Sequence, residues 1–196
     1  METLENEIRD TDRADRREIA EAAVIRNATE ADIPAVAAIY AHHVRHGLAS
    51  FEEKPPSAKE MLRRFRALND QGMPYIVAET RAGLVAYAYA GPYRARPAYR
   101  HSVENAVYID PDWTGLGLGG KLLPLIIERC TEMGFRQMIA IIGDSENDAS
   151  IRLHARHGFH PTGTLHSVGH KHGRWVDTVI MQRALGPGDS TPPCRD

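Results

Sequence analysis

The chain has 196 residues and a mass of 21.8 kDa; 42% of its residues are hydrophobic, 26% are charged, and its formal net charge is −2. A chain of this length buries roughly 70% of the surface that its unfolded form exposes, so we expect one domain with its own core. The small negative charge argues against a nucleic-acid binder, and the lack of an apolar run of about 18 residues argues against a membrane span. Cys130 and Cys194 are too few for a disulfide framework, which favours a cytoplasmic location.

Charge is unevenly distributed along the chain. Residues 1–23 hold eight acidic and four basic side chains, and residues 186–196 are rich in glycine and proline. Segments of this composition bury too little apolar surface to offset the entropy of ordering. We therefore predict a charged N-terminal extension over 1–23, flexible or at most a loose surface helix, and a flexible C-terminal tail over 186–196. The domain between them, residues 24–185, is mildly basic, with a net charge of +3.

The first half of this domain is predicted to contain a strand, two helices and a hairpin. A strand over 24–28 precedes a helix that begins with a capping-box-like pair, Thr29 and Asp32. Ser57 is placed to cap a second helix, which carries apolar residues on one face and stops near Gly72. Two apolar runs on either side of a glycine turn predict the β-hairpin, over residues 75–80 and 84–90.

The second half alternates strands with helices. Its predicted elements are a strand over 100–109, a helix that ends at Met133, a strand over 136–142, a helix over 148–157 and a strand over 176–182. Helices and strands in this order indicate an α/β or α+β domain in which helices cover a mixed sheet.

A glycine-rich loop between a strand and a helix, residues 107–123 with the sequence VYIDPDWTGLGLGGKLL, is the most informative stretch. Glycines let the backbone approach a ligand closely, and the free N–H groups of a helix N-terminus attract anions such as a pyrophosphate. A nucleotide-binding P-loop would need a hydroxyl residue at Leu122, and a dinucleotide fingerprint would need glycine there. A loop that is merely flexible is the remaining alternative.

The segment Thr114–Gly119 resembles the coenzyme A pyrophosphate loop of the GNAT N-acetyltransferases, whose pattern is Gln/Arg-x-x-Gly-x-Gly/Ala; Thr114 departs from the usual Gln or Arg. The resemblance covers residues 24–185. Three further segments, 91–99, 101–108 and 169–177, are similar to the phosphinothricin and methionine sulfoximine/sulfone acetyltransferase branch. The resemblance implies a three-layer GNAT fold with a mixed sheet of about six or seven strands between helices. It also implies acetyl-CoA as cofactor, a small amine or amino acid as substrate, and a homodimer without a nucleic-acid or membrane partner.

Residues for cofactor binding follow from the same resemblance. The strand before the glycine loop is expected to offer backbone groups to the pantetheine arm, and the loop to hold the pyrophosphate. Asn147 resembles the family residue that contacts the pantetheine, and Ser150 lies on the same predicted helix face as His154. The full predicted set is Val107, Tyr108, Ile109, Thr114, Gly115, Leu116, Gly117, Leu118, Gly119, Gly120, Asn147 and Ser150.

Acetyl transfer to an amine needs a base for the amine and a proton for the departing thiolate. Glu104 lies in an apolar strand, where burial should raise the pKa of its carboxylate, and the resemblance also makes it the general base. An ion-paired surface glutamate is the alternative. His154 is the candidate acid or hydrogen-bond donor, because the family branch has Leu-His where other members have a tyrosine; a histidine that is merely packed is the alternative.

The acceptor site is predicted from charge and shape. Arg94 and Arg96 alternate beside Tyr99 and could hold an α-carboxylate; the resemblance favours Arg96 and Tyr99, and exposed arginines without function are the alternative. Phe51, in a loop expected to be mobile, resembles an aromatic residue that covers the site. Histidine spacings such as His166 to His170 lack the partners of a metal site, so no metal is predicted.

The predicted function is acetyl-CoA-dependent N-acetylation by direct transfer. The acceptor is the free amine of a small amino acid or analogue such as phosphinothricin, methionine sulfoximine or methionine sulfone. Alternatives are acetylation of another small amine or a protein N-terminus, and a non-catalytic acyl-CoA-binding module.

Overall fold

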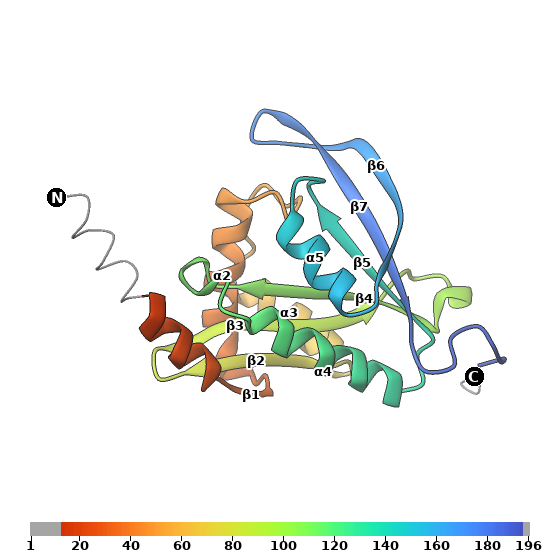
Figure 1. Cartoon of the computed structure of the whole chain (residues 1–196), viewed down its shortest axis with the longest axis horizontal. Coiled ribbons are helices and arrows are strands. Elements are labelled where there is room, and N and C mark those ends of the chain that lie inside the picture. The colour runs from red at the N-terminus through yellow and green to blue at the C-terminus, as the bar shows by residue number, and fades with distance from the viewer. Residues whose placement is uncertain (1–12, 194–196) are drawn as a thin grey trace.

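The computed structural model, which describes residues 13–193, is built on one seven-stranded sheet (Figure 1). The strand order is β1-β2-β3-β4-β5-β7-β6, and every neighbouring pair is antiparallel except β4 and β5. The strands are β1 (Val24–Asn27), β2 (Tyr75–Thr80), β3 (Gly83–Pro92), β4 (Ser102–Ile109), β5 (Gln137–Gly143), β6 (His160–Lys171) and β7 (Arg174–Ala184).

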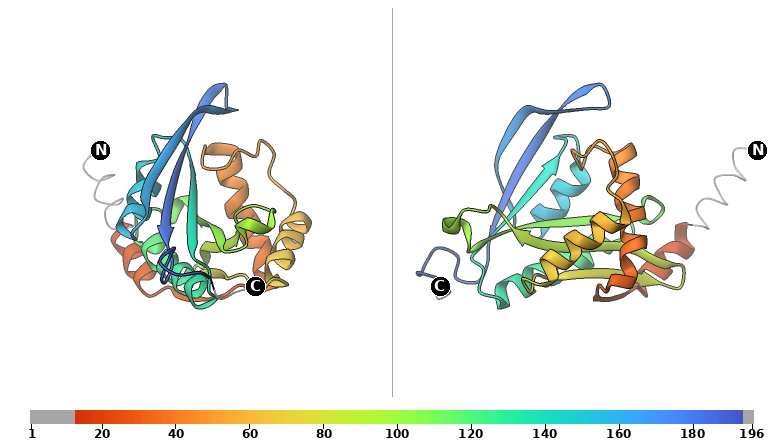
Figure 2. Two further views of the ribbon diagram at one scale, coloured as in Figure 1. Left: turned by 90° about the vertical axis from the view of Figure 1, so that its right-hand side faces the viewer. Right: turned by 180° about the vertical axis from the view of Figure 1, so that it is seen from behind.

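Helices cover both faces of this sheet. Figures 1 and 2 show α4 and α5 on one face and α2 and α3 on the other, and the β6–β7 hairpin extends beyond the helical layers. This is the three-layer α/β arrangement expected from the sequence. The helices are α2 (Ile33–His46), α3 (Ala58–Asn69), α4 (Leu118–Glu132) and α5 (Asp148–Arg156), with 3-10 turns at Glu30–Asp32, Pro97–Tyr99 and Pro111–Trp113. No helix within residues 13–193 is long and apolar enough to cross a membrane.

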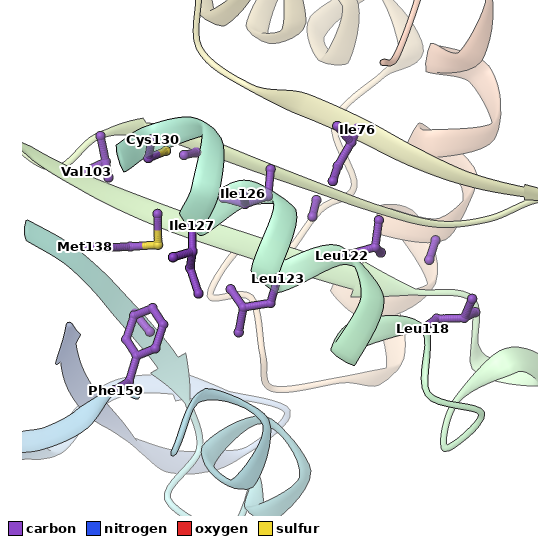
Figure 3. Packing of buried hydrophobic residues seen from close by; sticks show 14 of the residues in the cluster. Ile76, Val103, Leu118, Leu122, Leu123, Ile126, Ile127, Cys130, Met138 and Phe159 are labelled. Atoms are coloured by element: carbon purple, nitrogen blue, oxygen red, sulfur yellow. The ribbon is translucent and has the colours of Figure 1, made fainter. Parts of the chain in front are cut away.

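Alternation along β3 explains how the two helical layers pack. Successive side chains of a strand point to opposite faces. Ala86 and Ala88 lie in the cluster with α4, where small side chains let the helix approach, and Tyr87 packs in the cluster with α2 and α3. On the α4 side, an apolar stripe of the helix meets Ile76 and Val103 of the sheet (Figure 3). The stripe consists of Leu118, Leu122, Leu123, Ile126, Ile127 and Cys130.

The sheet divides between its two parallel strands. β4 and β5 pair only from Ser102 with Gln137 to Asn105 with Ala140. Beyond that point β4 stays paired with β3 as far as Ile109, while β5 stays paired with β7 as far as Gly143. The carboxyl halves of the two strands therefore separate, and the edge of β4 that faces the gap has no strand partner among residues 13–193. The loops leading into α4 and α5 follow these two ends.

The capping signals in the sequence are confirmed. Asp32 accepts a hydrogen bond from the backbone N of Thr29 at 2.7 Å, and the Oγ of Ser57 accepts one from the N of Glu60 at 3.2 Å at the start of α3. One strand was not predicted. β6 is an edge strand with Pro161 and two glycines, and most of its side chains are exposed, so it carries no alternating apolar pattern.

The predicted domain boundaries remain predictions, because residues 1–12 and 194–196 lie outside the described part. Residues 13–21 are helical, and Ala20 is fully buried in the core. Lys121 of α4 donates from Nζ to the carbonyl oxygens of Ala20 and Glu21 at 3.0 and 2.6 Å. After β7, the backbone of Gly188 and Pro192 accepts hydrogen bonds from Arg136 at 3.1 and 2.8 Å.

Candidate active site

The gap between β4 and β5 holds a cavity of about 280 Å³. Its lining comes from both faces of the sheet, because Tyr89 and Tyr108 face α2 and α3, whereas Ser150 and His154 come from α5 on the other face. The cavity therefore extends through the gap to both faces of the sheet. Its lining residues are Ala49, Phe51, Tyr89, residues 104–108, residues 140–143, Asn147, Ser150, His154 and Thr178.

Glu104 places a half-buried carboxylate in this cavity. Burial raises the pKa of Glu104 above its ordinary value of 4.5, and the positive charge of Arg94 partly opposes the shift. Within residues 13–193 the carboxylate has no hydrogen bond or ion pair, so it is free to take up a proton from a ligand. The alternative of an ion-paired surface glutamate does not fit these surroundings, although Arg94 is near enough to act through its charge.

His154 is buried, at 4% exposure, and both of its ring nitrogens have neighbours. Nδ1 lies 2.8 Å from the carbonyl oxygen of Ser150, which can only accept, so Nδ1 carries the proton and donates it. Nε2 then accepts from the side-chain nitrogen of Asn105 at 2.9 Å. To act as an acid, the ring would first need a proton at Nε2, and burial lowers its pKa. The acid role of His154 stays a prediction that this arrangement does not favour.

The glycine loop forms a backbone cradle at the start of α4. Gly115 and Gly117 have φ of +73° and +86°, a conformation that favours glycine, and α4 has no side-chain cap at its N-terminus. Its first amide groups therefore lack partners within the helix and can bind an anion. Thr114 directs its hydroxyl back to the carbonyl of Pro111 at 3.0 Å, so the cradle depends on backbone rather than on this side chain.

The remaining predicted cofactor residues lie along the path from this cradle to Glu104. Val107, Tyr108, Asn147 and Ser150 line the cavity. The side-chain oxygen of Asn147 caps α5 by accepting from the N of Ser150 at 3.2 Å. The carbonyl of Ile109, at the end of β4, accepts from Nε2 of His43 in α2 at 2.7 Å, which fixes the end of the strand.

The predicted acceptor residues are not all brought together. Phe51 lines the cavity beside Glu104, whereas Arg94 and Arg96 line a neighbouring cavity of about 750 Å³ together with Arg100. Tyr99 is 41% exposed, and its ring packs edge-on against Tyr93. The arginines therefore form a basic surface outside the cavity of Glu104, and Arg94 is the one whose charge acts on Glu104 among the described residues.

Sequence reasoning missed two residues around the cavity. Asn105 is buried and holds His154; the signal was a polar residue among Val103 and Val107 on one face of an apolar strand. Lys171 is buried as well, at 4% exposure, and its ammonium binds two loop carbonyls. It belongs to a segment used for the family resemblance, but no role was predicted for it.

Comparison with known protein families matches residues 25–180 to the acetyltransferase (GNAT) domain. The chain belongs to the GNAT acetyltransferase family. It is 53% identical over 172 residues to a phosphinothricin N-acetyltransferase of Alcaligenes faecalis, covering 88% of this chain and 87% of the relative. An L-methionine sulfoximine/L-methionine sulfone acetyltransferase of Pseudomonas paraeruginosa is 41% identical over 171 residues, covering 87% and 99%.

Among solved structures, the chain is similar to a GNAT superfamily phosphinothricin acetyltransferase from Sinorhizobium meliloti in complex with acetyl-CoA. The TM-score is 0.85 and the identity 44%, and the match covers 88% of this chain and 94% of the other. The chain is thus an N-acetyltransferase of the GNAT family, with acetyl-CoA as its cofactor. Its glycine cradle fits this cofactor, because two positive-φ glycines and an uncapped helix N-terminus suit a pyrophosphate.

Proposed function

We propose that this GNAT acetyltransferase acetylates the α-amino group of a small amino acid or analogue, of the phosphinothricin, methionine sulfoximine or methionine sulfone type. The observation that carries the proposal is the Glu104 carboxylate, half-buried and without a hydrogen-bond partner in residues 13–193, in a cavity that opens through the sheet. The identity with the phosphinothricin and methionine sulfoximine enzymes supports the choice of acceptor.

Glu104 is assigned as the general base. An amine reacts only when it is neutral, so the acceptor's ammonium must lose a proton at the site. A carboxylate whose pKa is raised by burial accepts that proton at Oε more readily than an ordinary one, either directly or through water. Ala49, Phe51 and Tyr89 enclose the same side of the cavity and restrict the acceptor to a small molecule.

Bound acetyl-CoA supplies the acetyl group as a thioester, and the protein has to hold it between the glycine cradle and Glu104. The unpaired edge of β4 beyond Asn105 offers backbone groups to an extended chain, in the manner of an added strand. On the α5 side, the Ser150 hydroxyl can donate a hydrogen bond to the departing sulfur, whose proton comes from the nitrogen that has attacked the thioester and carries one proton in excess. No covalent acyl-enzyme is part of this scheme.

Arg96 and Arg94 are proposed to hold the acceptor's α-carboxylate. Arg94 is near enough to Glu104 to act on its pKa, Arg96 lines the same cavity as Arg94, and a guanidinium can bind a carboxylate with two parallel hydrogen bonds. Tyr99 flanks this surface with an exposed ring. A carboxylate held there would leave the neighbouring α-amino group close to the entrance of the cavity.

A homodimer in the cytoplasm is the proposed working form. The β6–β7 hairpin exposes large apolar side chains, with Val168 at 52% and Trp175 at 67% exposure, and such residues are typical of an interface. Cys130 is a buried free thiol, in keeping with a reducing compartment. Sedimentation analysis is expected to give twice the mass of the chain.

The function is tested by following thiol release from acetyl-CoA against a panel of amino acids and amines. Release should require an acceptor with a free α-amino group and α-carboxylate, and Glu104→Gln should lower kcat by about 10²–10⁴ without weakening acetyl-CoA binding. Glu128 is an exposed carboxylate on α4, and Glu128→Gln is the matched control that should leave kcat unchanged. Tight acetyl-CoA binding without turnover on any acceptor would instead indicate a non-catalytic binding module.

A further inference from the structure

The loop after α2, residues 47–52, forms one wall of the acceptor side of the cavity through Ala49 and Phe51. The sequence predicts a mobile loop, and this stays a prediction; in the structure several side chains bond to the loop. The hydroxyl of Tyr40 bonds to Oγ of Ser50 at 2.8 Å, and Arg64 donates to Oε1 of Glu52 at 2.6 Å. These contacts attach the loop to α2 and α3.

Lys171, the last residue of β6, attaches the same loop to the β6–β7 hairpin. Its Nζ donates to the carbonyl oxygens of Ser50 at 2.6 Å and Gly47 at 2.9 Å, which lie on either side of Ala49. The ammonium is buried and has no carboxylate within ion-pair distance among residues 13–193. Burial of a cation is costly, and it is offset here by the two charge-assisted hydrogen bonds to the loop and by the nearby negative charges of Glu52 and Glu53.

Gly169 lies two residues before Lys171 and therefore on the same side of β6. The ring of Phe51 lies against its Cα: a Cβ at this position would come within 2.7 Å of Cδ2 of Phe51. Only glycine leaves room for the ring. Gly169 and Lys171 together fix where Phe51 stands relative to Glu104.

The same hairpin also holds the opposite wall of the cavity. Arg174 binds Oδ2 of Asp144 at 2.5 Å, and Asp177 accepts from the hydroxyl of Ser145 at 3.0 Å. These bonds fix the turn that leads from β5 to Asn147. The β6–β7 hairpin is thus attached to both walls, and residues 169–177, which carry the family resemblance, contact the cavity only through the segments they hold.

We propose that Lys171 is a positioning residue that sets the width of the acceptor side by holding Phe51, and so helps the enzyme to select compact amino-acid side chains. The inference rests on the proposed acetylation of small amino acids at Glu104. Without the ammonium the loop detaches from β6, Phe51 moves away, and small acceptors lose contact with one wall. The glycine cradle and the β4 edge are not touched by this change.

The test is Lys171→Met, which keeps most of the apolar stem of the side chain but removes the ammonium and its hydrogen bonds. We expect the KM for the acceptor to rise about tenfold, with kcat and the KM for acetyl-CoA within about twofold of the wild type. Lys59→Met, an exposed lysine on α3, is the matched control and should change none of these values. Equal increases in the KM values of both substrates would overturn the proposal.

A double-mutant cycle shows whether Lys171 acts through Phe51. In a Phe51→Ala background, Lys171→Met should have no further effect on the acceptor KM; the same tenfold rise in that background would contradict the proposal. Gly169→Ala is a second variant that displaces the ring directly, and it should reproduce the selective rise if Lys171→Met does not fold. Thermal unfolding identifies variants that are merely unstable.

Amide hydrogen exchange separates failure of this inference from failure of the proposed function. Lys171→Met should speed exchange at residues 47–52, with residues 118–132 of α4 unchanged as an internal reference. If the wild type acetylates no amino acid, this exchange result still decides whether Lys171 holds the loop. Unchanged exchange at residues 47–52 would show that it does not.

Discussion

Two neighbouring residues of β4 serve opposite faces of the sheet. Glu104 and Asn105 point to opposite sides because strand side chains alternate. Glu104 faces the side of Tyr89 and Tyr108, where the acceptor is proposed to enter, and Asn105 holds His154 on the side of α5. The gap beside them places both within one cavity, so the proposed base and the proposed cofactor channel adjoin at one position of the strand.

At the residue scale, the raised pKa of Glu104 predicts a conflict between stability and activity. Its folded-state pKa lies above 4.5, so the folded protein binds this proton more tightly than the unfolded chain does. The contribution to stability is complete below pH 4.5 and is lost as pH rises through the folded pKa. Glu104→Gln should therefore raise Tm by about 2 °C at pH 7 while it abolishes most activity.

The measurement is Tm of the wild type and of Glu104→Gln between pH 4 and pH 8. The two curves should approach each other at the acid end and separate as pH rises. A constant difference across this range would show that the carboxylate is not destabilised by burial. The kcat/KM of the wild type should rise with pH over the same interval, since the base has to be ionised.

At the element scale, α4 has a positive-φ glycine at each end. Gly117 precedes the helix with φ of +86°, and Gly134 follows it with φ of +82°; neither would bring a Cβ within 4 Å of another residue. An alanine costs about 1 kcal/mol in either place, because only the backbone conformation is strained. The two positions differ in one respect: Gly117 belongs to the anion cradle.

Gly117→Ala and Gly134→Ala should therefore lower Tm by similar amounts, about 2–4 °C. Only Gly117→Ala should also weaken the binding of acetyl-CoA and raise its KM about tenfold. Relaxation of the strained residue would rotate amide groups away from the pyrophosphate. Acetyl-CoA titration by calorimetry and thermal unfolding provide the two readouts. Equal acetyl-CoA affinity in the two variants would remove Gly117 from the binding site.

Elements with local signals could be predicted from the sequence. Thr29 and Ser57 mark helix starts through hydrogen bonds made within a few residues, and the glycine loop marks another through its positive-φ residues. All three helices begin there or within one short turn. β6 has no such signal, because its order comes from pairing with β7 and from contacts of Lys171 with a distant loop. The strand propensity of a residue depends on its own side chain and local sequence, and it carries no information about the partners that folding brings together.

The same distinction applies to the candidate site. Glu104 and the glycine cradle lie in one continuous segment, so the sequence places them near each other. The separation of β4 from β5, which creates the cavity, depends on pairing with β3 and β7 and has no local signal. Arg96 was predicted from charge, shape and the family resemblance, and the structure places it in a different cavity from Glu104.

At the scale of the whole molecule, the divided sheet places the regions proposed for the two substrates on opposite faces. The glycine cradle and α5 lie on one face, and the loop that carries Phe51 lies on the other. A cofactor held from one side and an acceptor held from the other can approach in line through the gap, which orients the reacting groups. The β6–β7 hairpin stabilises this arrangement. Its side chains bond to the loop that carries Phe51 on one side of the cavity and to the turn after β5 on the other.

Two histidines on opposite faces of the sheet, the half-buried His43 and the buried His154, predict how the stability of the whole fold depends on pH. Burial lowers the pKa of both His43 and His154 below 6.5, so the unfolded chain takes up protons that the folded chain excludes. Their contribution to stability is present above pH 6.5 and is lost as pH falls through the folded pKa values. The contribution of Asp32 to stability is lost only at lower pH, because its hydrogen bond with Arg26 lowers the pKa of Asp32 to about 2.

We therefore expect Tm to fall between pH 7 and pH 5, well before the carboxylates of the surface ion pairs titrate. His154→Gln should flatten this part of the curve, and the exposed His160→Gln should leave its slope unchanged. Because Glu104 titrates with the opposite sign, the cleanest measurement places both variants in the Glu104→Gln background. A slope that is identical in all backgrounds would mean that neither the buried imidazole of His154 nor the Glu104 carboxylate governs acid sensitivity, and that the fold tolerates a charge at the centre of its sheet.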